Sequence, residues 1–289
     1  MATIMFDINA YFRFIQSPQN DFIKQIKIHL EGGSKSSKLR KENGEALIEG
    51  IHLVKAWIQA KKISQISALV TSTTDINHPE IAPLIEELIQ YCQDSDTDFP
   101  ELIMVDDSIK NSISSFATGP CLMATVSIPK DSFSFAEKLD TIVLDAIQDS
   151  GNVGTILRTA AAAGYKNIVC TVGTASIWSI KVLRAGMGAH LDLSIMESVS
   201  AQEYLDQVTQ CVYVTALDSK AKSLYDLGDA LLQAHTFVFG NEGQGANPIF
   251  LKHGTSIIIP QESGVESLNV SAATAVSLFE ARRIRKKLS

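Results

Sequence analysis

Residues 139–164 read LDTIVLDAIQDSGNVGTILRTAAAAG, and this stretch decides the fold class. Its first part, residues 139–147, is rich in β-branched side chains and is bounded by polar groups, which predicts a buried strand. Asn152 is well placed to be the N-cap of a helix that runs through Ala163 and ends at Gly164. A buried strand followed directly by a capped helix is typical of an α/β domain.

Strands and helices alternate along the rest of the chain as well. Downstream, strands are predicted at residues 167–172, 211–217, 236–240 and 256–260, with a last helix from about Leu268 to Arg285. Upstream, strands are predicted at 67–71, 101–105 and 121–128, with helices at 46–60 and 81–91. This order predicts a C-terminal parallel sheet with helices on both faces, preceded by a smaller α/β domain.

The length of 289 residues suits two domains. The run Pro129-Lys130-Asp131-Ser132 is the best candidate for their boundary, and a polar, basic break at residues 31–41 marks off the N-terminus. We therefore predict an N-terminal helical extension over residues 1–33, a smaller α/β domain over 34–130 and a larger α/β domain over 131–289.

Composition excludes several classes of protein. Hydrophobic residues make up 45% and charged residues 20% of the chain, which excludes a disordered protein and a small disulfide scaffold. The cysteines and histidines lack metal-ligand spacing, no apolar run approaches the length of a membrane span, and the N-terminus lacks the apolar region of a signal peptide. We expect a cytoplasmic, soluble protein with buried free thiols, no metal and no membrane association.

The first of three unusual segments opens the helix described above. Gly154, Arg158 and Ala162 are four residues apart and therefore share one helix face. Arg158 can then point towards the carboxyl ends of the strands, where open α/β sheets bind ligands. The alternative is a capped helix whose arginine is merely solvated.

The second segment is a glycine-rich loop, Gly240-Asn241-Glu242-Gly243-Gln244-Gly245, directly after a predicted strand. Its G-x-x-G-x-G spacing is not that of a dinucleotide site, and the G-K-[ST] of a phosphate-binding loop is missing. Glu242 would also repel phosphate. Such a loop suits a ligand with a positive or neutral centre, unless it is a tight turn only.

The third segment runs from a strand that stops at Pro260, through a polar loop with Gly264, into a helix dense in small residues. Ser267 and Asn269 bring a hydroxyl and an amide to the mouth of this helix. They can hold a ligand or simply cap the helix.

Together the three segments resemble the signature motifs of the SpoU (TrmH) family of RNA ribose 2′-O-methyltransferases, in the SPOUT superfamily. The matching residues are Asn152 with Arg158, Gly240-Asn241-Glu242-Gly243, and Glu266-Ser267-Leu268-Asn269-Val270-Ser271. Leu183-Arg184-Ala185-Gly186-Met187-Gly188-Ala189 is similar to the family's small-residue stretch. Lys38-Leu39-Arg40-Lys41-Glu42-Asn43-Gly44 with Ile48-Glu49-Gly50 resembles the substrate-binding domain of many members.

The resemblance implies a C-terminal trefoil knot, a homodimer and S-adenosylmethionine as cofactor. It implies cofactor contacts, largely through backbone groups, from Gly240, Ile259 and Leu268, with Phe239, Gly243 and Pro260 beside them. The implied catalytic group is Arg158, supported by Asn152, Glu242, Ser267 and Asn269. Arg158 is either the general base for the ribose hydroxyl or an orienting cation, because a guanidinium is a poor base at neutral pH.

RNA is the implied substrate, and ribosomal RNA is favoured over transfer RNA. Because the net charge is −7, RNA binding must come from local basic segments. The candidates are Lys35, Lys38, Arg40 and Lys41, and a second cluster made of Arg282, Arg283, Arg285, Lys286 and Lys287. Two alternatives are a non-catalytic RNA-binding protein with the same fold and a nucleotide-binding metabolic enzyme.

Overall fold

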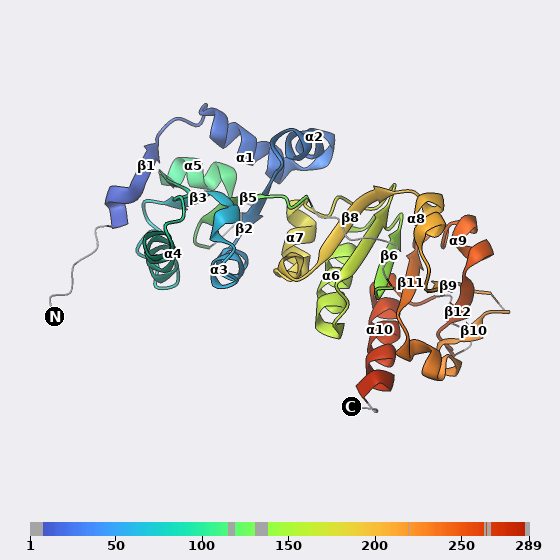
Figure 1. The fold of residues 1–289 in the computed structure, drawn as a ribbon. Helices are drawn as coiled ribbons and strands as arrows, with labels where there is room; N and C mark the ends of the chain where they lie inside the picture. The colour runs from blue at the N-terminus through green and yellow to red at the C-terminus, as the bar shows by residue number, and fades with distance from the viewer. Residues whose placement is uncertain are drawn as a thin grey trace. The chain divides into compact units, whose positions relative to one another are not determined.

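A computed structural model of the chain describes residues 8–114, 119–130, 138–218, 220–262, 264 and 267–286. The chain forms two compact units (Figure 1). Unit 1 comprises Met1–Pro129 and Trp178–Arg184, and unit 2 comprises Lys130–Ile177 and Ala185–Ser289. Residues 1–33 therefore lie in the same compact unit as residues 34–129. Among the described residues, no helix has both the length and the apolar character needed to cross a membrane.

Unit 1 is built on a mixed five-stranded sheet in the order β1-β4-β3-β5-β2, in which β5 runs antiparallel to both neighbours. Its strands are β1 (Phe12–Ile15), β2 (Glu45–Glu49), β3 (Ile66–Ser72), β4 (Glu101–Val105) and β5 (Leu122–Ser127). Its helices are η1 (Ile8–Tyr11), α1 (Asp21–Glu31), α2 (Gly33–Asn43), α3 (Ile51–Gln59), η2 (Ile63–Gln65), α4 (Ile81–Ser95), α5 (Asp107–Ile113) and most of α7 (Ile180–Gly186).

Three sequence-based expectations for unit 1 are wrong. Residues 46–49 belong to strand β2 rather than to a helix over 46–60, because all four side chains are buried and Gly50 breaks the chain direction at φ 104°. Residues 33–43 form helix α2 rather than an irregular break, and Gly44 caps this helix in the left-handed conformation. The first 33 residues are also not helical throughout, because β1 pairs in parallel with β4.

The core of unit 1 collects side chains that lie far apart in the sequence. Ile23 and Ile26 of α1 pack with sheet residues such as Val70 and Ile103, and Ile180 of α7 joins the same cluster. Arg184, also on α7, forms an ion pair with Glu49, whose side chain is 2% exposed. The ion pair therefore joins two of the motifs that the sequence singled out.

Unit 2 is an all-parallel seven-stranded sheet in the order β10-β12-β9-β11-β6-β7-β8. Its strands are β6 (Thr141–Asp145), β7 (Asn167–Thr171), β8 (Ser194–Val199), β9 (Cys211–Thr215), β10 (Lys222–Ser223), β11 (His235–Gly240) and β12 (Thr255–Ile258). Its helices are α6 (Ser150–Ala163), η3 (Ala189–Leu191), α8 (Ala201–Gln207), η4 (Leu224–Asp226), η5 (Gly228–Leu232), α9 (Pro248–His253) and α10 (Val270–Lys286).

Helices cover both faces of this sheet. Helices α6 and α10 pack against each other on one face, and α8 and α9 pack together on the other (Figure 1). Val143, Val169 and Val238 contribute to the core under α8 and α9, because side chains alternate along each strand. The predicted α/β class, with a parallel C-terminal sheet, is confirmed. Strands β8 and β10 were missed: β8 lies at the sheet edge with partly exposed side chains, and β10 has only two residues.

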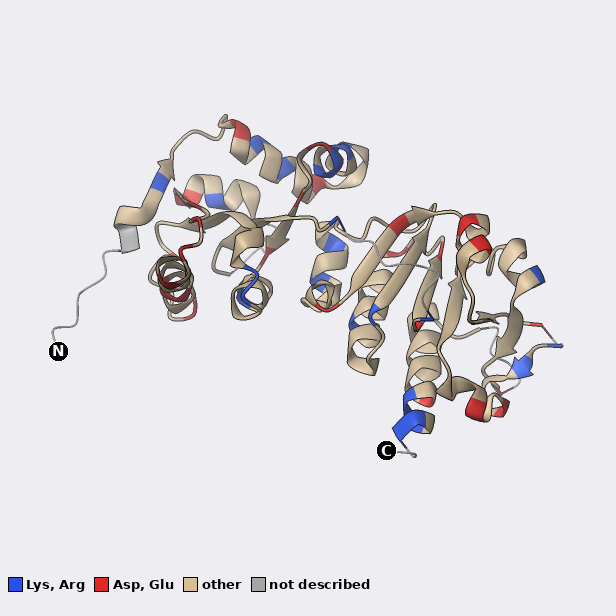
Figure 2. Ribbon diagram, in the orientation of Figure 1, with Lys and Arg blue, Asp and Glu red and all other residues tan. Residues whose placement is uncertain are grey.

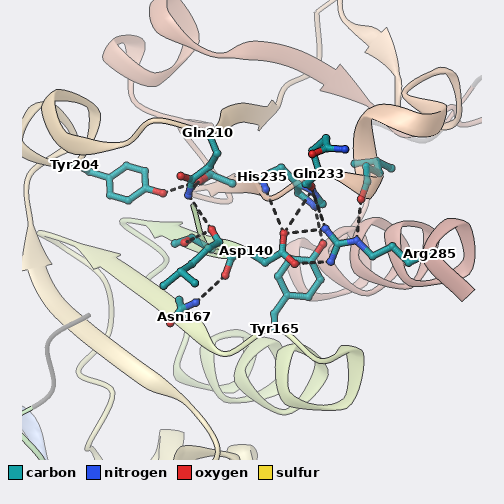
Figure 3. A network of polar contacts seen from close by, with 12 residues as sticks. Asp140, Tyr165, Asn167, Tyr204, Gln210, Gln233, His235 and Arg285 are labelled. Atoms are coloured by element: carbon teal, nitrogen blue, oxygen red, sulfur yellow. Dashed lines mark hydrogen bonds and ion pairs between the residues drawn. The ribbon is translucent and has the colours of Figure 1, made fainter. Parts of the chain in front are cut away.

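A partly buried polar network closes unit 2 at the edge where the strands begin (Figure 3). The guanidinium of Arg285, near the end of α10, forms an ion pair with Asp140 and donates to the carbonyl oxygens of Leu231 at 2.8 Å and Gln233 at 3.1 Å. His235 lies beside this pair, with Nε2 2.7 Å from the Tyr165 hydroxyl. The network ties the end of α10 to the sheet.

The second basic cluster predicted to bind RNA therefore has another use. Arg282 donates to the carbonyl oxygen of Ala163, Arg283 pairs with Glu280, and Arg285 is held by Asp140. The bonds of Arg282 and Arg285 dock the helix end on its own unit, whereas Arg283 pairs within α10 and stays exposed. Lys287 lies outside the described residues.

Buried histidines make the stability of the protein depend on pH. Burial lowers the pKa of His190 to about 4 and, together with Arg40, that of His29 to about 4. Burial also lowers the pKa of His235. In the unfolded chain a histidine is protonated below about pH 6.5. The stabilisation that comes from these neutral histidines is therefore fully present above that pH and is lost as the pH falls towards 4. For His190 the loss is on the order of 3 kcal/mol.

We expect the urea concentration at half-unfolding to fall markedly between pH 7.5 and pH 5, as measured by circular dichroism. Replacement of the exposed His253 by Gln should leave this pH dependence unchanged. A flat stability profile over this interval would contradict the assignment of neutral, buried histidines.

Candidate active site

Four adjacent parallel strands, in the order β12-β9-β11-β6, end at one edge of the unit 2 sheet. The three segments singled out in the sequence all leave the sheet there: residues 146–152 after β6, 241–247 after β11 and 259–269 after β12. The carboxyl edge of a parallel sheet is the usual ligand side of an open α/β fold. The topology therefore brings together residues more than a hundred positions apart in the chain.

Side chains from the three segments form one hydrogen-bonded chain. Asn152 Nδ2 donates to Glu242 Oε1 at 2.9 Å, and Asn269 Nδ2 donates to Asn152 Oδ1 at 3.0 Å. Asn269 Oδ1 then accepts from the backbone N–H of Ser271 at 2.9 Å, in the first turn of α10. Three of the five predicted catalytic residues are thus in direct contact.

The donor and acceptor roles in this series of hydrogen bonds are determined by the groups at its two ends. A carboxylate only accepts hydrogen bonds, so Asn152 must turn its amide N–H towards Glu242 and its oxygen towards Asn269. Asn269 must then donate to Asn152, which leaves its own oxygen for the N–H groups that begin α10. Asn269 is therefore both a cap of α10 and the link from α10 to α6.

Helix α6 presents Asn152 and Arg158 from its first turns. Asp149, not Asn152, is the N-cap, because Asp149 Oδ1 accepts from the Asn152 N–H at 2.7 Å. This corrects the sequence-based cap and leaves the Asn152 side chain for Glu242. Arg158 is exposed, and no hydrogen bond or ion pair within the described part of the chain holds its guanidinium. Its donors are available to a ligand.

The glycine-rich loop folds back tightly onto its own strand. Asn241 and Gly245 exchange two backbone hydrogen bonds, of 3.0 and 2.9 Å. The Asn241 side chain donates to the carbonyl oxygen of Ala146 at 2.8 Å and accepts from the N–H groups of Gly243 and Gln244. Sequence reasoning gave Asn241 no role, although an asparagine at the start of a turn is a known signal for such bonds.

The predicted cofactor residues cluster at the same edge. Gly240 ends β11, Ile259 follows β12, and Leu268 lies just before α10 with 38% of its surface exposed. Pro260 and Gly243 are also exposed. The side chain of Phe239 is fully buried in the core, so any ligand contact of this residue must use its backbone.

Besides Arg158, the predicted catalytic residue Ser267 is not part of the hydrogen-bonded chain. Ser267 is exposed and makes no side-chain hydrogen bond to any residue that the structure describes. Glu266 lies outside the described residues.

Comparisons with known proteins identify relatives of this chain. A family model described as the SpoU rRNA Methylase family matches residues 140–279. The chain is 32% identical to an uncharacterized tRNA/rRNA methyltransferase of Synechocystis, over 96% of this chain and 97% of that protein. It is 28% identical to the 23S rRNA (guanosine(2553)-2′-O)-methyltransferase RlmP of Bacillus subtilis, over 93% and 98% of the two chains.

The fold is also that of a solved structure, the AdoMet-bound rRNA methyltransferase of Sinorhizobium meliloti. The TM-score is 0.76 at 22% identity, with 94% of this chain and 98% of that chain covered. The family model spans all the segments that carry the assembled site residues, and the Synechocystis relative matches nearly from end to end. This chain belongs to the SpoU rRNA methylase family.

Proposed function

We propose that this chain transfers the methyl group of S-adenosylmethionine to a ribose 2′-hydroxyl of ribosomal RNA. The observation that carries the proposal is the hydrogen-bonded chain Glu242–Asn152–Asn269 together with the guanidinium of Arg158, which lies on the same helix as Asn152 and has no partner among the described residues. Its relative from Bacillus subtilis is by name a 23S rRNA 2′-O-methyltransferase.

The residues at the site fit S-adenosylmethionine. The ligand combines an apolar adenine ring with a cationic sulfonium, and the site offers the exposed Leu268 together with the Glu242 carboxylate. Gly240, Ile259 and Leu268 hold the cofactor, chiefly through backbone groups. When bound, the cofactor supplies an activated methyl group. The solved relative from Sinorhizobium meliloti is described as AdoMet-bound.

The protein's own contribution to the reaction is positioning and electrostatics. The ribose hydroxyl must approach the methyl group in line and must give up its proton, which passes to solvent water at this exposed site. Arg158 orients the RNA phosphate and stabilises the alkoxide that forms, since its guanidinium is a strong multiple donor and a poor base. Asn152 and Asn269 fix the first turns of α6 and α10, and Glu242 faces the cationic cofactor.

Unit 1 supplies the RNA-binding surface in this proposal. Lys35, Lys38 and Lys41 on α2 are exposed, and Figure 2 shows basic residues along α2. Arg40 is different: it is 5% exposed, and its guanidinium donates to Ser36 Oγ at 2.6 Å. Its charge is turned inward, so the structure gives no support to the expectation that Arg40 contacts RNA.

Replacement of Lys35, Lys38 and Lys41 together by Gln should weaken RNA binding and make it less sensitive to salt. The logarithm of the RNA-binding constant falls with the logarithm of the salt concentration, and each lost phosphate contact reduces the magnitude of this slope by roughly 0.7 to 0.9. The three replacements together should therefore reduce it by about 2 to 3. Filter binding of ribosomal RNA at several salt concentrations measures this slope. Replacement of the exposed Lys61 and Lys62 in the same unit is the matched control. If the two variants give equal slopes, the RNA does not bind at the lysines of α2.

The decisive experiment for the function uses RNA from a strain that lacks this gene. Purified protein, S-adenosylmethionine and either ribosomal or transfer RNA are combined, and 2′-O-methylated nucleotides are mapped by mass spectrometry. We expect one new methylated nucleotide, in ribosomal RNA. Methylation of transfer RNA alone would overturn the substrate, and RNA binding without any methylation would favour the non-catalytic alternative.

The proposal also covers the oligomeric state of the protein and its cellular compartment. A homodimer is supported by the apolar side chain of Phe279, which is 47% exposed on α10, a helix that packs against α6. Sedimentation equilibrium would measure the assembly. The trefoil knot stays a prediction, as do the domain roles. A cytoplasmic location is supported by four free cysteines, of which Cys211 is exposed, contrary to the expectation that all are buried.

A further inference from the structure

Asp145 is a buried acid directly beneath the glycine-rich loop, Gly240–Asn247. It is the last residue of β6, it pairs in register with Gly240 of β11, and it is 4% exposed. A buried carboxylate is costly unless donors surround it. As the last residue of β6, Asp145 lies at the carboxyl edge of the sheet, where the three segments leave their strands.

Each oxygen of Asp145 has a donor. Oδ1 accepts from the Thr171 hydroxyl at 2.8 Å, and Oδ2 accepts from the backbone N–H of Asn247 at 2.6 Å. The Thr171 oxygen itself accepts from the Ala146 N–H at 2.9 Å, so its single proton is committed to Asp145. The direction of both bonds is therefore determined, and Asp145 accepts in both.

These bonds close the glycine-rich loop at its far end. Asn241 anchors the start of the loop to the carbonyl oxygen of Ala146, and Asp145 anchors Asn247 at its end. Between the two anchors the loop folds back so closely that Ala246 N lies 2.2 Å from the position of a Cβ on Gly240. The tip then presents Glu242 to Asn152.

We propose that Asp145 is a positioning residue that holds the glycine-rich loop in its cofactor-binding form through the backbone N–H of Asn247. This inference rests on the proposed function, since it assigns the loop to S-adenosylmethionine. Asp145 acts through the loop and does not touch the reacting atoms. Without its carboxylate, the Asn247 N–H loses its acceptor and the loop opens from its C-terminal end.

The test measures S-adenosylmethionine affinity by isothermal titration calorimetry on the full chain. Asp145→Ala should bind the cofactor at least about tenfold more weakly, because a hydrogen bond to a charged group is lost. Asp145→Asn should recover much of this affinity, because its amide oxygen can still accept from Asn247 while its N–H₂ donates to Thr171. Asp140→Ala is the matched control, since Asp140 lies just before the same strand at the opposite edge of the sheet.

The control should lower the melting temperature and leave cofactor affinity unchanged. If Asp145→Ala also has a lower melting temperature but keeps the cofactor affinity of the wild type, Asp145 has only a structural role and the proposal is overturned. If the wild-type chain itself does not bind S-adenosylmethionine, the proposed function fails instead, so the two failures are distinguishable.

A second pair of variants tests the same bond if Asp145→Ala does not fold. Asn247 has φ −54°, which suits proline, and proline has no N–H to donate. Asn247→Pro should weaken cofactor binding to the level expected for Asp145→Ala. Asn247→Ala also loses the side-chain cap of α9 but keeps the N–H, so it should bind as the wild type does. Equal affinities for the two Asn247 variants would overturn the proposal.

Discussion

Arg158→Ala is expected to abolish methyl transfer while leaving S-adenosylmethionine binding intact. Arg158 is exposed and holds no partner among the described residues, so its removal leaves no buried group unsatisfied and does not disturb the fold. Loss of a donor that stabilises a developing oxyanion lowers kcat by on the order of a hundredfold to a thousandfold. Radiolabelled methyl transfer to ribosomal RNA measures the rate, and calorimetry measures cofactor binding.

Two further variants sharpen this prediction. Arg158→Lys keeps the charge but loses the planar fork, so it should recover only part of the rate if the guanidinium orients a phosphate. Lys252→Ala removes an exposed cation from α9 and should have the wild-type rate. Methylation by Arg158→Ala at close to the wild-type rate would remove Arg158 from the mechanism.

Gly240→Ala is expected to eliminate cofactor binding. An added Cβ would lie 2.2 Å from Ala246 N and 2.4 Å from the carbonyl carbon of Gly245, and both are backbone atoms. Because neither can rotate away, the loop must leave its place on the strand. We expect S-adenosylmethionine affinity to fall by about a hundredfold or more, since the whole backbone cradle and the Glu242–Asn152 contact move together.

Gly254→Ala is the matched control for this steric effect. A Cβ on Gly254 would lie 2.6 Å from Val214 Cγ2 and 3.0 Å from the Val212 carbonyl oxygen, at the other end of the same sheet. This variant should lose thermal stability and still bind the cofactor when folded. If Gly240→Ala binds S-adenosylmethionine like the wild type, the glycine-rich loop is not part of the cofactor site.

Local structure could be predicted from the sequence. Short runs of β-branched and aromatic residues located β6, β7, β9, β11 and β12, and β6, β7 and β11 are almost wholly buried. Gly164 marked the end of α6, since its φ of 90° suits glycine. The three motifs, in their order, were sufficient to predict the family that the comparisons then established.

Other features depend on contacts between distant segments. The Glu49–Arg184 and Asp140–Arg285 ion pairs each join residues more than a hundred positions apart, and neither partner carries a local signal. The same holds for Arg40, which reads as a surface cation but is buried. The periodicity of a helix or a strand shows which of its faces is apolar. It does not show which distant residue will pair with a given charged side chain.

By itself the sequence determined the α/β class and the family, and it predicted Asn152, Arg158, Glu242, Ser267 and Asn269 as site residues. Tertiary structure alone decided that Glu242, Asn152 and Asn269 are hydrogen-bonded in that order, that Asp149 rather than Asn152 caps α6, and that Asp145 holds the glycine-rich loop at Asn247. The physical reason is that propensity and periodicity act over a few neighbouring residues. Hydrogen-bond partners at the carboxyl edge are chosen instead by the strand order β12-β9-β11-β6, which places three distant loops side by side.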